Sequence, residues 1–279
     1  MPIERIIFIV LSVILGILIV DFLVWAFLAA PRLSHKRMAK YRNLYYAHRG
    51  LHGEGACENS LSAFERAVAA GYGIELDVRL SGSGELVVFH DANAIRVTGV
   101  DKKIADMSLD ELRGLRLGAT DDSVPTFREV LSLVNGKVPL LIEIKLGEGE
   151  SGVAEAFLRE IEGYTGEFIV ESFNPRALAA VKKQRPDIPI GILSLEYTRE
   201  ERFRGKFIYR LGEKLRLNFM FRPDFIAYDQ KGYRVLSLRM LRKIFRVPTI
   251  AWTIRSVDEE RAARAHGFEG IIFEGYIPK

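Results

Sequence analysis

Acidic residues and a histidine are concentrated in one short stretch of the chain, residues 73–91. Glu75 and Asp77 lie two positions apart in a run with the alternating pattern of a β-strand, so their side chains point to the same face. A second strand-like run follows a Ser-Gly-Ser-Gly turn and ends in His90 and Asp91. The stretch therefore predicts a β-hairpin that carries groups capable of metal binding and proton transfer.

The length of the turn decides on which face His90 lies. With Gly82 and Ser83 as a two-residue turn, His90 lies opposite Glu75 and points to the same side. A shift of one residue turns His90 to the other face. In the first case two carboxylates and an imidazole suit a hard cation beside an acid–base group. The alternative is a solvent-exposed edge hairpin with an acidic outer face.

Further reactive residues lie where other predicted strands end. His48 and Arg49 follow the first strand, Glu143 and Lys145 share a face of the third, and Glu171 ends the fourth. The carboxyl ends of the strands of a closed parallel barrel meet at one mouth. Because carboxylates repel one another unless something cationic is bound, their convergence favours a functional site.

Eight predicted strands alternate with helical segments after residue 43, which is typical of a parallel sheet. Eight such units predict a TIM (β/α)8 barrel over residues 43–279, with the hairpin and a short insertion after the second strand. A doubly wound sheet is the alternative, but no glycine-rich dinucleotide motif follows the first strand. The strands are centred near residues 45, 75, 142, 170, 190, 226, 251 and 272.

Capping residues mark the starts of several helices. Asn59 or Ser60 begins a helix that Gly71 ends, and Asn174 precedes a proline at the first helical position. Three capping boxes, in which Ser or Thr is followed three residues later by Glu, predict helix starts at Ser108, Thr126 and Ser256.

The first 42 residues differ from the rest of the chain. Residues 6–30 are apolar apart from Asp21 and are long enough to cross a bilayer as a helix. A cleaved signal peptide is the alternative, but the apolar stretch is too long for one. Five Lys and Arg residues between Arg32 and Arg42, against one before the helix, place the C-terminal domain in the cytoplasm, with the basic flank on anionic lipid. We therefore expect residues 1–42 to form a single-pass anchor in the cell membrane.

Composition excludes several classes of protein. The net charge of +4 comes from residues 1–42, where six basic and two acidic residues lie; of the 40 basic and 36 acidic residues in the chain, 34 of each sign remain. The predicted barrel thus has no overall basic character that would indicate nucleic-acid binding. The only cysteine, Cys57, excludes an internal disulfide and a cysteine metal cluster.

The ordered motifs from about Tyr45 onward resemble those of the glycerophosphodiester phosphodiesterase family, whose members are TIM barrels. The resemblance implies hydrolysis of glycerophosphodiesters to glycerol 3-phosphate and an alcohol, with Mg²⁺ or Ca²⁺. The motifs are His48-Arg49-Gly50, Glu58-Asn59-Ser60 with Ala63-Phe64, Glu75-Leu-Asp77-Val, His90-Asp91 and Glu143-Ile-Lys145.

The resemblance also implies roles for individual residues. Divalent cations held by carboxylates neutralise phosphate oxygens, an arginine can bind two of them, and two histidines with pKa values near ~6.5 can share proton transfer. By resemblance, His48 and His90 are the acid–base pair, Glu75, Asp77 and Glu143 bind the metal, and Arg49 and Lys145 bind phosphate.

Three positions depart from the family pattern. Cys57 stands where proline is usual, Arg255 where asparagine is common, and Glu274 ends a Phe-Glu pair where Thr-Asp is common. We expect these residues at the barrel rim and substrate pocket, away from the metal and histidine positions, where they would alter head-group preference. Trp252 is a candidate for stacking on the substrate, with core packing as the alternative.

A helical stretch is predicted from about residue 200 to 218. Phe203, Phe207, Leu211 and Leu215 recur every four residues, which indicates either a helix that covers the barrel or a basic amphipathic helix lying on the membrane. Basic residues fill its other faces: Arg204, Lys206, Arg210, Lys214 and Arg216.

These features favour a membrane-anchored, metal-dependent phosphodiesterase acting on a glycerophosphodiester or a lysophospholipid. Two alternatives remain: a phospholipase D-like barrel that cleaves lysophospholipids, and a catalytically silent membrane adaptor. No protein partner is implied by any of them.

Overall fold

The computed structural model describes residues 2–33, 36–147, 150–203 and 205–278. Within these residues, eight parallel strands close into a barrel, because β1 pairs with both β2 and β9. The expected (β/α)8 fold class is therefore confirmed. The strands are β1 (Tyr45–Ala47), β2 (Gly73–Leu80), β4 (Leu140–Ile144), β5 (Phe168–Ser172), β6 (Ile190–Ser194), β7 (Phe225–Asp229), β8 (Thr249–Ile254) and β9 (Gly270–Phe273), with β3 (Leu86–Val88) added antiparallel to β2.

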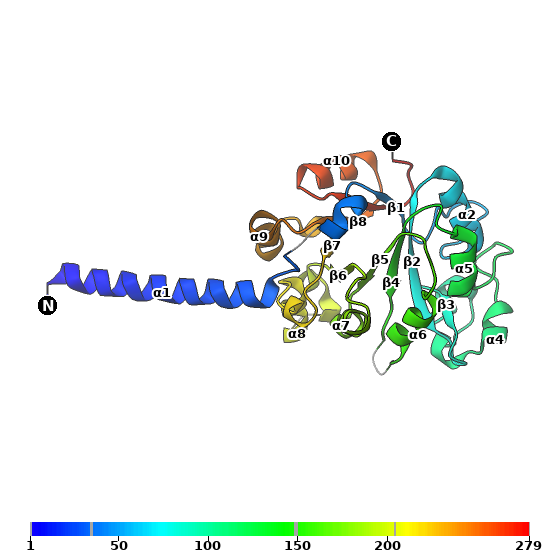
Figure 1. Cartoon of the computed structure of the whole chain (residues 1–279), viewed down its shortest axis with the longest axis horizontal. Helices are drawn as coiled ribbons and strands as arrows, with labels where there is room; N and C mark the ends of the chain where they lie inside the picture. The colour runs from blue at the N-terminus through cyan, green and yellow to red at the C-terminus, as the bar shows by residue number, and fades with distance from the viewer. Residues whose placement is uncertain (1, 34–35, 148–149, 204, 279) are drawn as a thin grey trace.

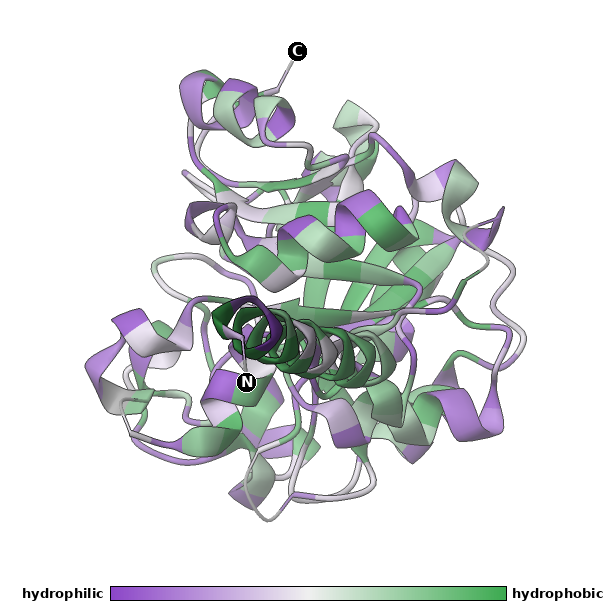
Figure 2. Ribbon diagram, turned by 90° about the vertical axis from the view of Figure 1, so that its left-hand side faces the viewer, coloured by the Kyte–Doolittle hydropathy of each residue, from purple (hydrophilic) through white to green (hydrophobic). Residues whose placement is uncertain are grey.

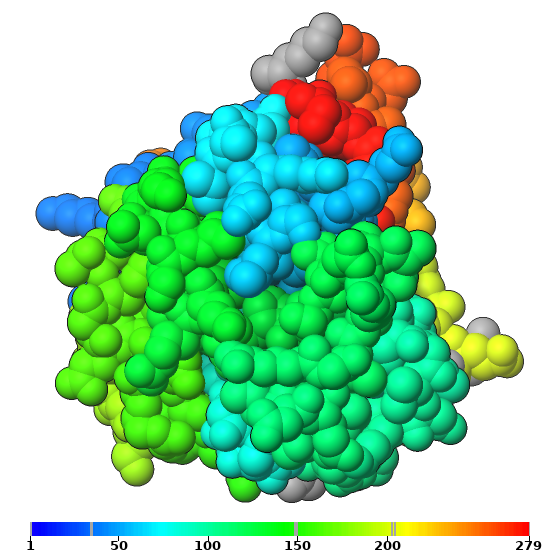
Figure 3. Space-filling model, turned by 90° about the vertical axis from the view of Figure 1, so that its right-hand side faces the viewer, coloured from blue at the N-terminus to red at the C-terminus, as the bar shows by residue number. Residues whose placement is uncertain are grey.

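Helices follow most strands and cover the outside of the barrel (Figure 1). The chain between β3 and β4 lies on the side turned away from the N-terminal helix, which Figure 3 shows. The helices are α1 (Ile3–Ala29), α2 (Leu61–Ala70), α3 (Ile95–Thr98), α4 (Leu109–Arg113), α5 (Phe127–Val134), α6 (Val153–Glu160), α7 (Pro175–Gln184), α8 (Phe207–Glu213), α9 (Leu236–Phe245) and α10 (Val257–Ala265).

Most of the predicted helix caps are present. Ser60 caps α2, and the capping boxes at Ser108 and Thr126 have both of their reciprocal hydrogen bonds. The third box is incomplete. Ser256 accepts the Glu259 N–H, but the Glu259 carboxylate accepts from the backbone of the residue before Ser256 rather than from Ser256 itself.

The apolar core of the barrel has two layers, and a separate apolar cluster lies within residues 87–124. One layer lies between the strands and the surrounding helices and includes Phe64, Phe127 and Phe157. The other fills the barrel interior at the amino ends of the strands, where Met38 and Tyr41 of the 3₁₀ helix η1 (Lys36–Tyr41) join residues from the strands. Because this apolar layer fills the interior at the amino ends of the strands, the buried polar groups lie at the carboxyl ends.

The hairpin register differs from the expected one by one residue. Val78 pairs with Val88 and Leu80 with Leu86, so the turn has three residues instead of two. Gly84 adopts φ +93°, in the left-handed region that glycine favours, and so allows the longer turn. β3 also ends two residues before His90, so strand pairing does not decide where His90 points.

The expected single helix over residues 200–218 is not formed. The segment consists of the 3₁₀ helix Glu201–Phe203, the short helix α8 and a further 3₁₀ turn, η5 (Asn218–Met220). Gly205, at φ +80°, separates the first two pieces. One of the basic residues of this segment, Arg204, lies outside the described residues.

Helix α1, 27 residues long, leaves the domain as a rod (Figure 1), and Figure 2 shows that most of it is hydrophobic. Its apolar side chains are exposed over most of its length. Among the described residues, the last turns of α1 make its contacts with the barrel. The Trp25 indole donates to Ser237 Oγ at 3.1 Å, and Asn218 Nδ2 donates to the Ala29 carbonyl at 2.8 Å. By length and composition, α1 can span a membrane.

Candidate active site

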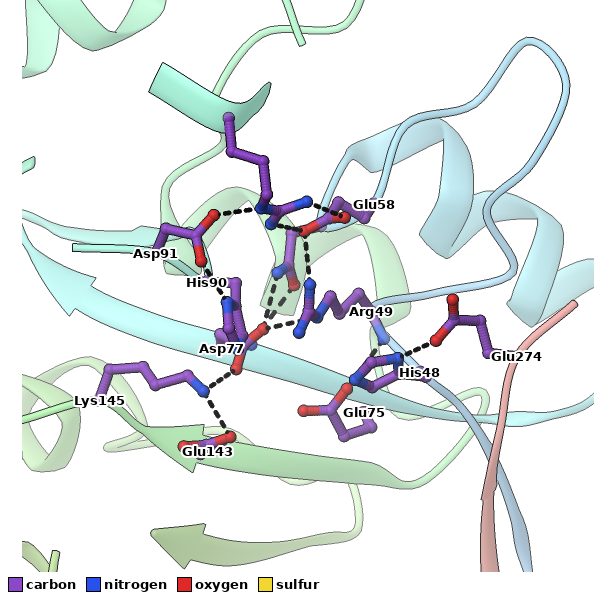
Figure 4. A network of polar contacts seen from close by, with 12 residues as sticks. His48, Arg49, Glu58, Glu75, Asp77, His90, Asp91, Glu143, Lys145 and Glu274 are labelled. Atoms are coloured by element: carbon purple, nitrogen blue, oxygen red, sulfur yellow. Dashed lines mark hydrogen bonds and ion pairs between the residues drawn. The ribbon is translucent and has the colours of Figure 1, made fainter. Parts of the chain in front are cut away.

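A row of acidic residues lies across three neighbouring strands at the mouth of the barrel, and Figure 4 shows three of them, Glu75, Asp77 and Glu143. Asp77 of β2 is aligned with Glu143 of β4, which is aligned with Glu171 of β5, and Glu75 lies two residues before Asp77. The four residues are 1–6 % exposed. Carboxylate oxygens of Glu75, Asp77 and Glu143 lie within 4.8 Å of one another.

Burial of these carboxyl groups shifts their pKa values apart. Burial raises the pKa of Glu75 and of Glu171 well above the usual range, and it raises the pKa of Glu143 to about 7. Burial acts on Asp77 in the same direction, but neighbouring positive charges, first that of Lys145, outweigh it and lower the pKa of Asp77. Asp77 is therefore the carboxylate that stays ionised in the cluster.

Three side chains hold Asp77 in place. Asn59 Nδ2 donates to Asp77 Oδ2 at 2.8 Å, and Arg49 Nε lies 3.6 Å from the same oxygen. Lys145 Nζ lies 3.0 Å from Asp77 Oδ1 and 2.7 Å from Glu143 Oε2, so it bridges two strands of the row. These cations offset part of the negative charge that is buried at the mouth.

The cluster fits a divalent cation. Carboxylate oxygens are the ligands that Mg²⁺ and Ca²⁺ prefer, and three of them already face one another here. In addition, Glu171 Oε2 is buried without a hydrogen-bond partner among the described residues, which indicates a local deficit of positive charge. Glu75, Asp77 and Glu143 are the residues that would hold the ion.

His48 follows β1 on a tight turn that packs against α2. Arg49 and Gly50 adopt φ values of +55° and +83°, and a Cβ on Gly50 would lie 2.8 Å from the side chain of Ala63. The backbone N–H of Arg49 donates to Glu75 Oε2 at 2.8 Å, which ties this turn to the carboxylate row. Burial lowers the pKa of His48.

Glu274 occupies an unexpected position. Its Oε2 lies 2.8 Å from His48 Nδ1, so the expectation that this family departure lies away from the histidines is wrong. Its carboxylate reaches the imidazole because it follows β9, the strand that pairs with β1. His52 and Glu274 also form a second group of metal-type ligands with His48, but all three are only partly buried.

His90 lies at the rim beside Asp77 even though it is not paired opposite Glu75 as expected. The backbone N–H of Phe89 donates to the Asp77 carbonyl, which carries the chain back towards the mouth. Asp91 Oδ1 lies 2.7 Å from His90 Nδ1, and burial lowers the pKa of His90 to about 4. In both histidines a carboxylate thus engages Nδ1 and leaves Nε2 for other contacts (Figure 4).

Ion pairs connect the loops that carry the two histidines. Glu58 accepts from Arg49 at 2.7 Å and from Arg96 Nη1 at 2.9 Å, while Arg96 also contacts Asp91. Burial raises the pKa of Glu58, but the two arginines outweigh it and lower that pKa to about 2. The network is a rigid link between the loop after β1 and the loop after β3.

An open cavity of about 480 Å³ adjoins the carboxylate row. Arg79, Glu143 and Lys145 line one end of it, and the other end is apolar. Trp252 is half-buried, with its ring edge-on to Phe173 of the cavity wall at 5.5 Å, and it also packs on the interior core layer. Its role in substrate binding stays a prediction. The apolar end is formed by Leu195, Tyr197, Phe203, Ile208, Tyr209 and Leu217.

Several residues of the site were not assigned from the sequence. Glu171 is expected at the mouth from its place at the end of the fourth strand, but it received no individual role. Asn59 lies within a family motif, but its contact with Asp77 depends on a left-handed backbone conformation at φ +56°. Glu58 lies in the same motif, but its contacts with Arg49 and Arg96 depend on the fold. The partner of Glu274, His48, is 226 residues away, so no local pattern shows that contact.

A (β/α)8 barrel whose mouth combines buried carboxylates, two histidines, an arginine and a lysine suits the hydrolysis of a phosphoric ester. The model of the glycerophosphoryl diester phosphodiesterase family matches residues 48–275 of this chain. The chain therefore belongs to that family, and it is a glycerophosphodiester phosphodiesterase.

Individual relatives agree with this assignment. The chain is 35 % identical over 164 residues to a glycerophosphodiester phosphodiesterase of Caldanaerobacter subterraneus subsp. tengcongensis, covering 54 % of this chain and 67 % of the relative. It is 28 % identical to a putative glycerophosphodiester phosphodiesterase of Bacillus subtilis, covering 81 % and 92 %. The solved glycerophosphodiester phosphodiesterase of Thermotoga maritima has a TM-score of 0.64 and 28 % identity, covering 82 % and 93 %.

The contact between Asn59 and Asp77 can be tested by stability. We expect Asn59→Gly to lower the free energy of unfolding by about 1–3 kcal/mol, because a buried carboxylate loses its neutral donor while the left-handed backbone stays unstrained. Asn135→Gly is the matched control, since Asn135 is also left-handed but exposed. Equal effects of both changes, measured by urea unfolding in uncharged detergent, would contradict the assignment.

Proposed function

We propose that this chain is a membrane-anchored, divalent-metal-dependent glycerophosphodiester phosphodiesterase in which His48 and His90 share acid–base catalysis. The observation that carries the proposal is the buried cluster of Glu75, Asp77 and Glu143 with a carboxylate-held histidine on either side. The products would be glycerol 3-phosphate and an alcohol.

The cluster and its cations suit a phosphodiester, which is anionic and resists nucleophiles. A bound Mg²⁺ or Ca²⁺ would neutralise non-bridging oxygens and orient the phosphorus. Arg49 and Lys145 provide further positive charge at the edge of the cluster, and the fork of Arg49 can donate two hydrogen bonds to a phosphate.

The histidines are arranged for proton transfer through Nε2. Glu274 and Asp91 accept from Nδ1–H of His48 and His90, respectively, which leaves Nε2 of the neutral ring as a base and, after it takes up a proton, as an acid. One imidazole removes the proton from the attacking hydroxyl, whether water or the glycerol hydroxyl of the substrate. The other donates a proton to the leaving alkoxide.

Turnover of glycerophosphocholine and glycerophosphoethanolamine by detergent-solubilised protein tests this proposal. We expect release of glycerol 3-phosphate that EDTA abolishes and Mg²⁺ or Ca²⁺ restores. His90→Ala and His48→Ala should each lower kcat by about 10²- to 10⁴-fold, the usual contribution of general acid–base catalysis. Glu75→Ala should remove the metal response.

A histidine outside the mouth provides the control for these variants. His266 is stacked on Tyr233 at 3.7 Å, and His266→Ala should leave turnover unchanged within about twofold. Full activity of both Glu75→Ala and His90→Ala would overturn the proposed site. Lipid binding by a protein that turns over no diester would instead support the silent adaptor.

The cavity beside the carboxylate row favours a second substrate class, lysophospholipids. The cavity has Glu143 and Lys145 at one end, and its apolar end is walled by a cluster of aromatic rings, with Phe203 and Tyr209 4.3 Å apart. An acyl chain attached to the glycerol moiety could occupy this space, since burial of each CH₂ group stabilises binding by about 0.8 kcal/mol. A lysophospholipase D of Rattus norvegicus is 33 % identical over 153 residues, half of this chain and 47 % of that protein.

A charge placed in the cavity tests this acyl site. We expect Ile208→Glu to lower kcat/KM for lysophosphatidylcholine about tenfold or more and to change kcat/KM for glycerophosphocholine by less than about twofold. Phe207→Glu is the matched control, because Phe207 is the preceding residue of α8, is 71 % exposed and does not line the cavity. Equal losses in both variants would indicate a general effect of charge on α8.

Anchoring of the barrel through α1 is the third part of the proposal. The helix is long and apolar enough to span a bilayer, and the Lys and Arg residues that follow it favour an orientation with the barrel in the cytoplasm. In a Cys57→Ala background, a membrane-impermeant maleimide should label Pro2→Cys in intact cells but Arg128→Cys only after lysis. The reverse pattern would contradict the orientation, and release of the protein by alkaline carbonate would contradict the anchor.

A further inference from the structure

Helix α9 carries a stripe of cations that the catalytic site does not use. Arg239, Arg242 and Lys243 lie on one side of α9 at intervals of three and one residues, and Arg246 is the C-cap residue that follows them. Leu238 and Leu241 cover the buried face. Like charges at this spacing repel one another and destabilise an isolated helix, so the stripe needs a compensating group.

The described part of the chain offers little compensation. None of the four cations of the stripe forms an ion pair with a described residue. The one carboxylate nearby, Glu269, lies 3.2 Å from Arg42 and is neutralised by it. Basic residues are common in the last turn of a helix, because they interact favourably with the helix dipole. This accounts for Arg242 and Lys243 but not for the other cations of the stripe.

The stripe forms one wall of a pocket of about 690 Å³. Arg42, Val247 and Glu269 contribute to the other walls, and these residues lie shortly before β1, β8 and β9. The pocket is thus at the amino ends of the strands, whereas the carboxylate row and both histidines lie at the carboxyl ends. It is therefore separate from the catalytic mouth.

Arg242 is the cation that lies deepest in this pocket. Its guanidinium stacks over the ring of Phe268 at 4.9 Å, and its Nη1 is buried without a hydrogen-bond partner among the described residues. Burial, together with the charge of Arg239, lowers the pKa of Arg242. A buried guanidinium donor without an acceptor is costly, and an anionic oxygen in the pocket would satisfy it.

We propose that this pocket, formed by Arg42, Arg239, Arg242, Lys243 and Arg246, binds a phosphate group. Guanidinium groups match the oxygens of a phosphate with paired hydrogen bonds, and several cations around one pocket suit a group that carries one or two negative charges. The ligand is held by its charge and is not cleaved, because the described lining has a single histidine, His266, and a single carboxylate, Glu269, instead of a histidine pair and a carboxylate cluster.

The position of α9 favours the headgroup of an anionic membrane lipid as the source of that phosphate. The ring of Phe245 lies 6.3 Å from that of Trp25, and Ser237 accepts the Trp25 indole hydrogen bond, so α9 packs on the end of α1 (Figure 2). Leu236 and Ile244 of α9 are 66 % and 50 % exposed, as expected of residues at a lipid interface. This choice of source rests on the anchoring proposed above, whereas the pocket itself does not.

Binding is tested with the full chain in an uncharged detergent. The probes are micelles doped with phosphatidic acid, micelles doped with phosphatidylcholine, and inorganic pyrophosphate in solution; phosphatidic acid is a monoester that a phosphodiesterase does not cleave. We expect saturable binding of phosphatidic acid that Arg239→Gln/Arg242→Gln weakens at least about tenfold, since each charge-assisted hydrogen bond contributes more than an ordinary one.

A variant with the same loss of charge on α7, Arg176→Gln/Lys183→Gln, is the matched control and should change binding by less than about twofold. Binding of pyrophosphate that depends on Arg239 and Arg242 would also support the pocket but assign it to a soluble phosphate. Equal losses in both double variants, or no saturable binding of either anion, would overturn the proposal. Unchanged turnover of glycerophosphocholine in both variants shows that they are folded and separates this result from the catalytic proposal.

Discussion

Electrostatic repulsion within the carboxylate row is the constraint on which the rest of the site depends. Glu75, Asp77, Glu143 and Glu171 are brought together by the register of β2, β4 and β5, and burial makes their charges costly. The apolar layer at the amino ends of the strands fixes the barrel, so the row cannot spread apart. Only protonation, neighbouring cations or a bound metal ion can relieve the repulsion.

The surrounding residues follow from that constraint. Lys145 lies between Asp77 and Glu143, and the turn that carries His48 donates a backbone hydrogen bond to Glu75. The same groups that stabilise the carboxylates are those proposed above to contact the phosphate of the substrate. Stability of the empty site and affinity for an anionic substrate are therefore set by the same few cations.

The fold places two polar sites at opposite ends of the barrel. The carboxyl ends of the strands hold the carboxylate row and the histidines, while the amino ends hold the apolar core layer and the basic pocket beside α9. Helix α1 joins the side of the barrel through Trp25 and Ala29, close to the short helical pieces between β6 and β7. The segment between β6 and β7 also supplies the apolar wall of the cavity next to the carboxylates. It therefore contacts both the end of α1 and the candidate active site.

The sequence by itself determined the strand order, most helix caps and the principal acidic and histidine positions, because hydrophobic periodicity and capping are local properties of the chain. Tertiary structure decided the rest. The hairpin turn depended on one left-handed glycine, Gly84, and the contact of Glu274 with His48 arose from pairing of the first and last strands, 226 residues apart. Such contacts are set by how distant segments close the barrel, and no pattern within either segment records them.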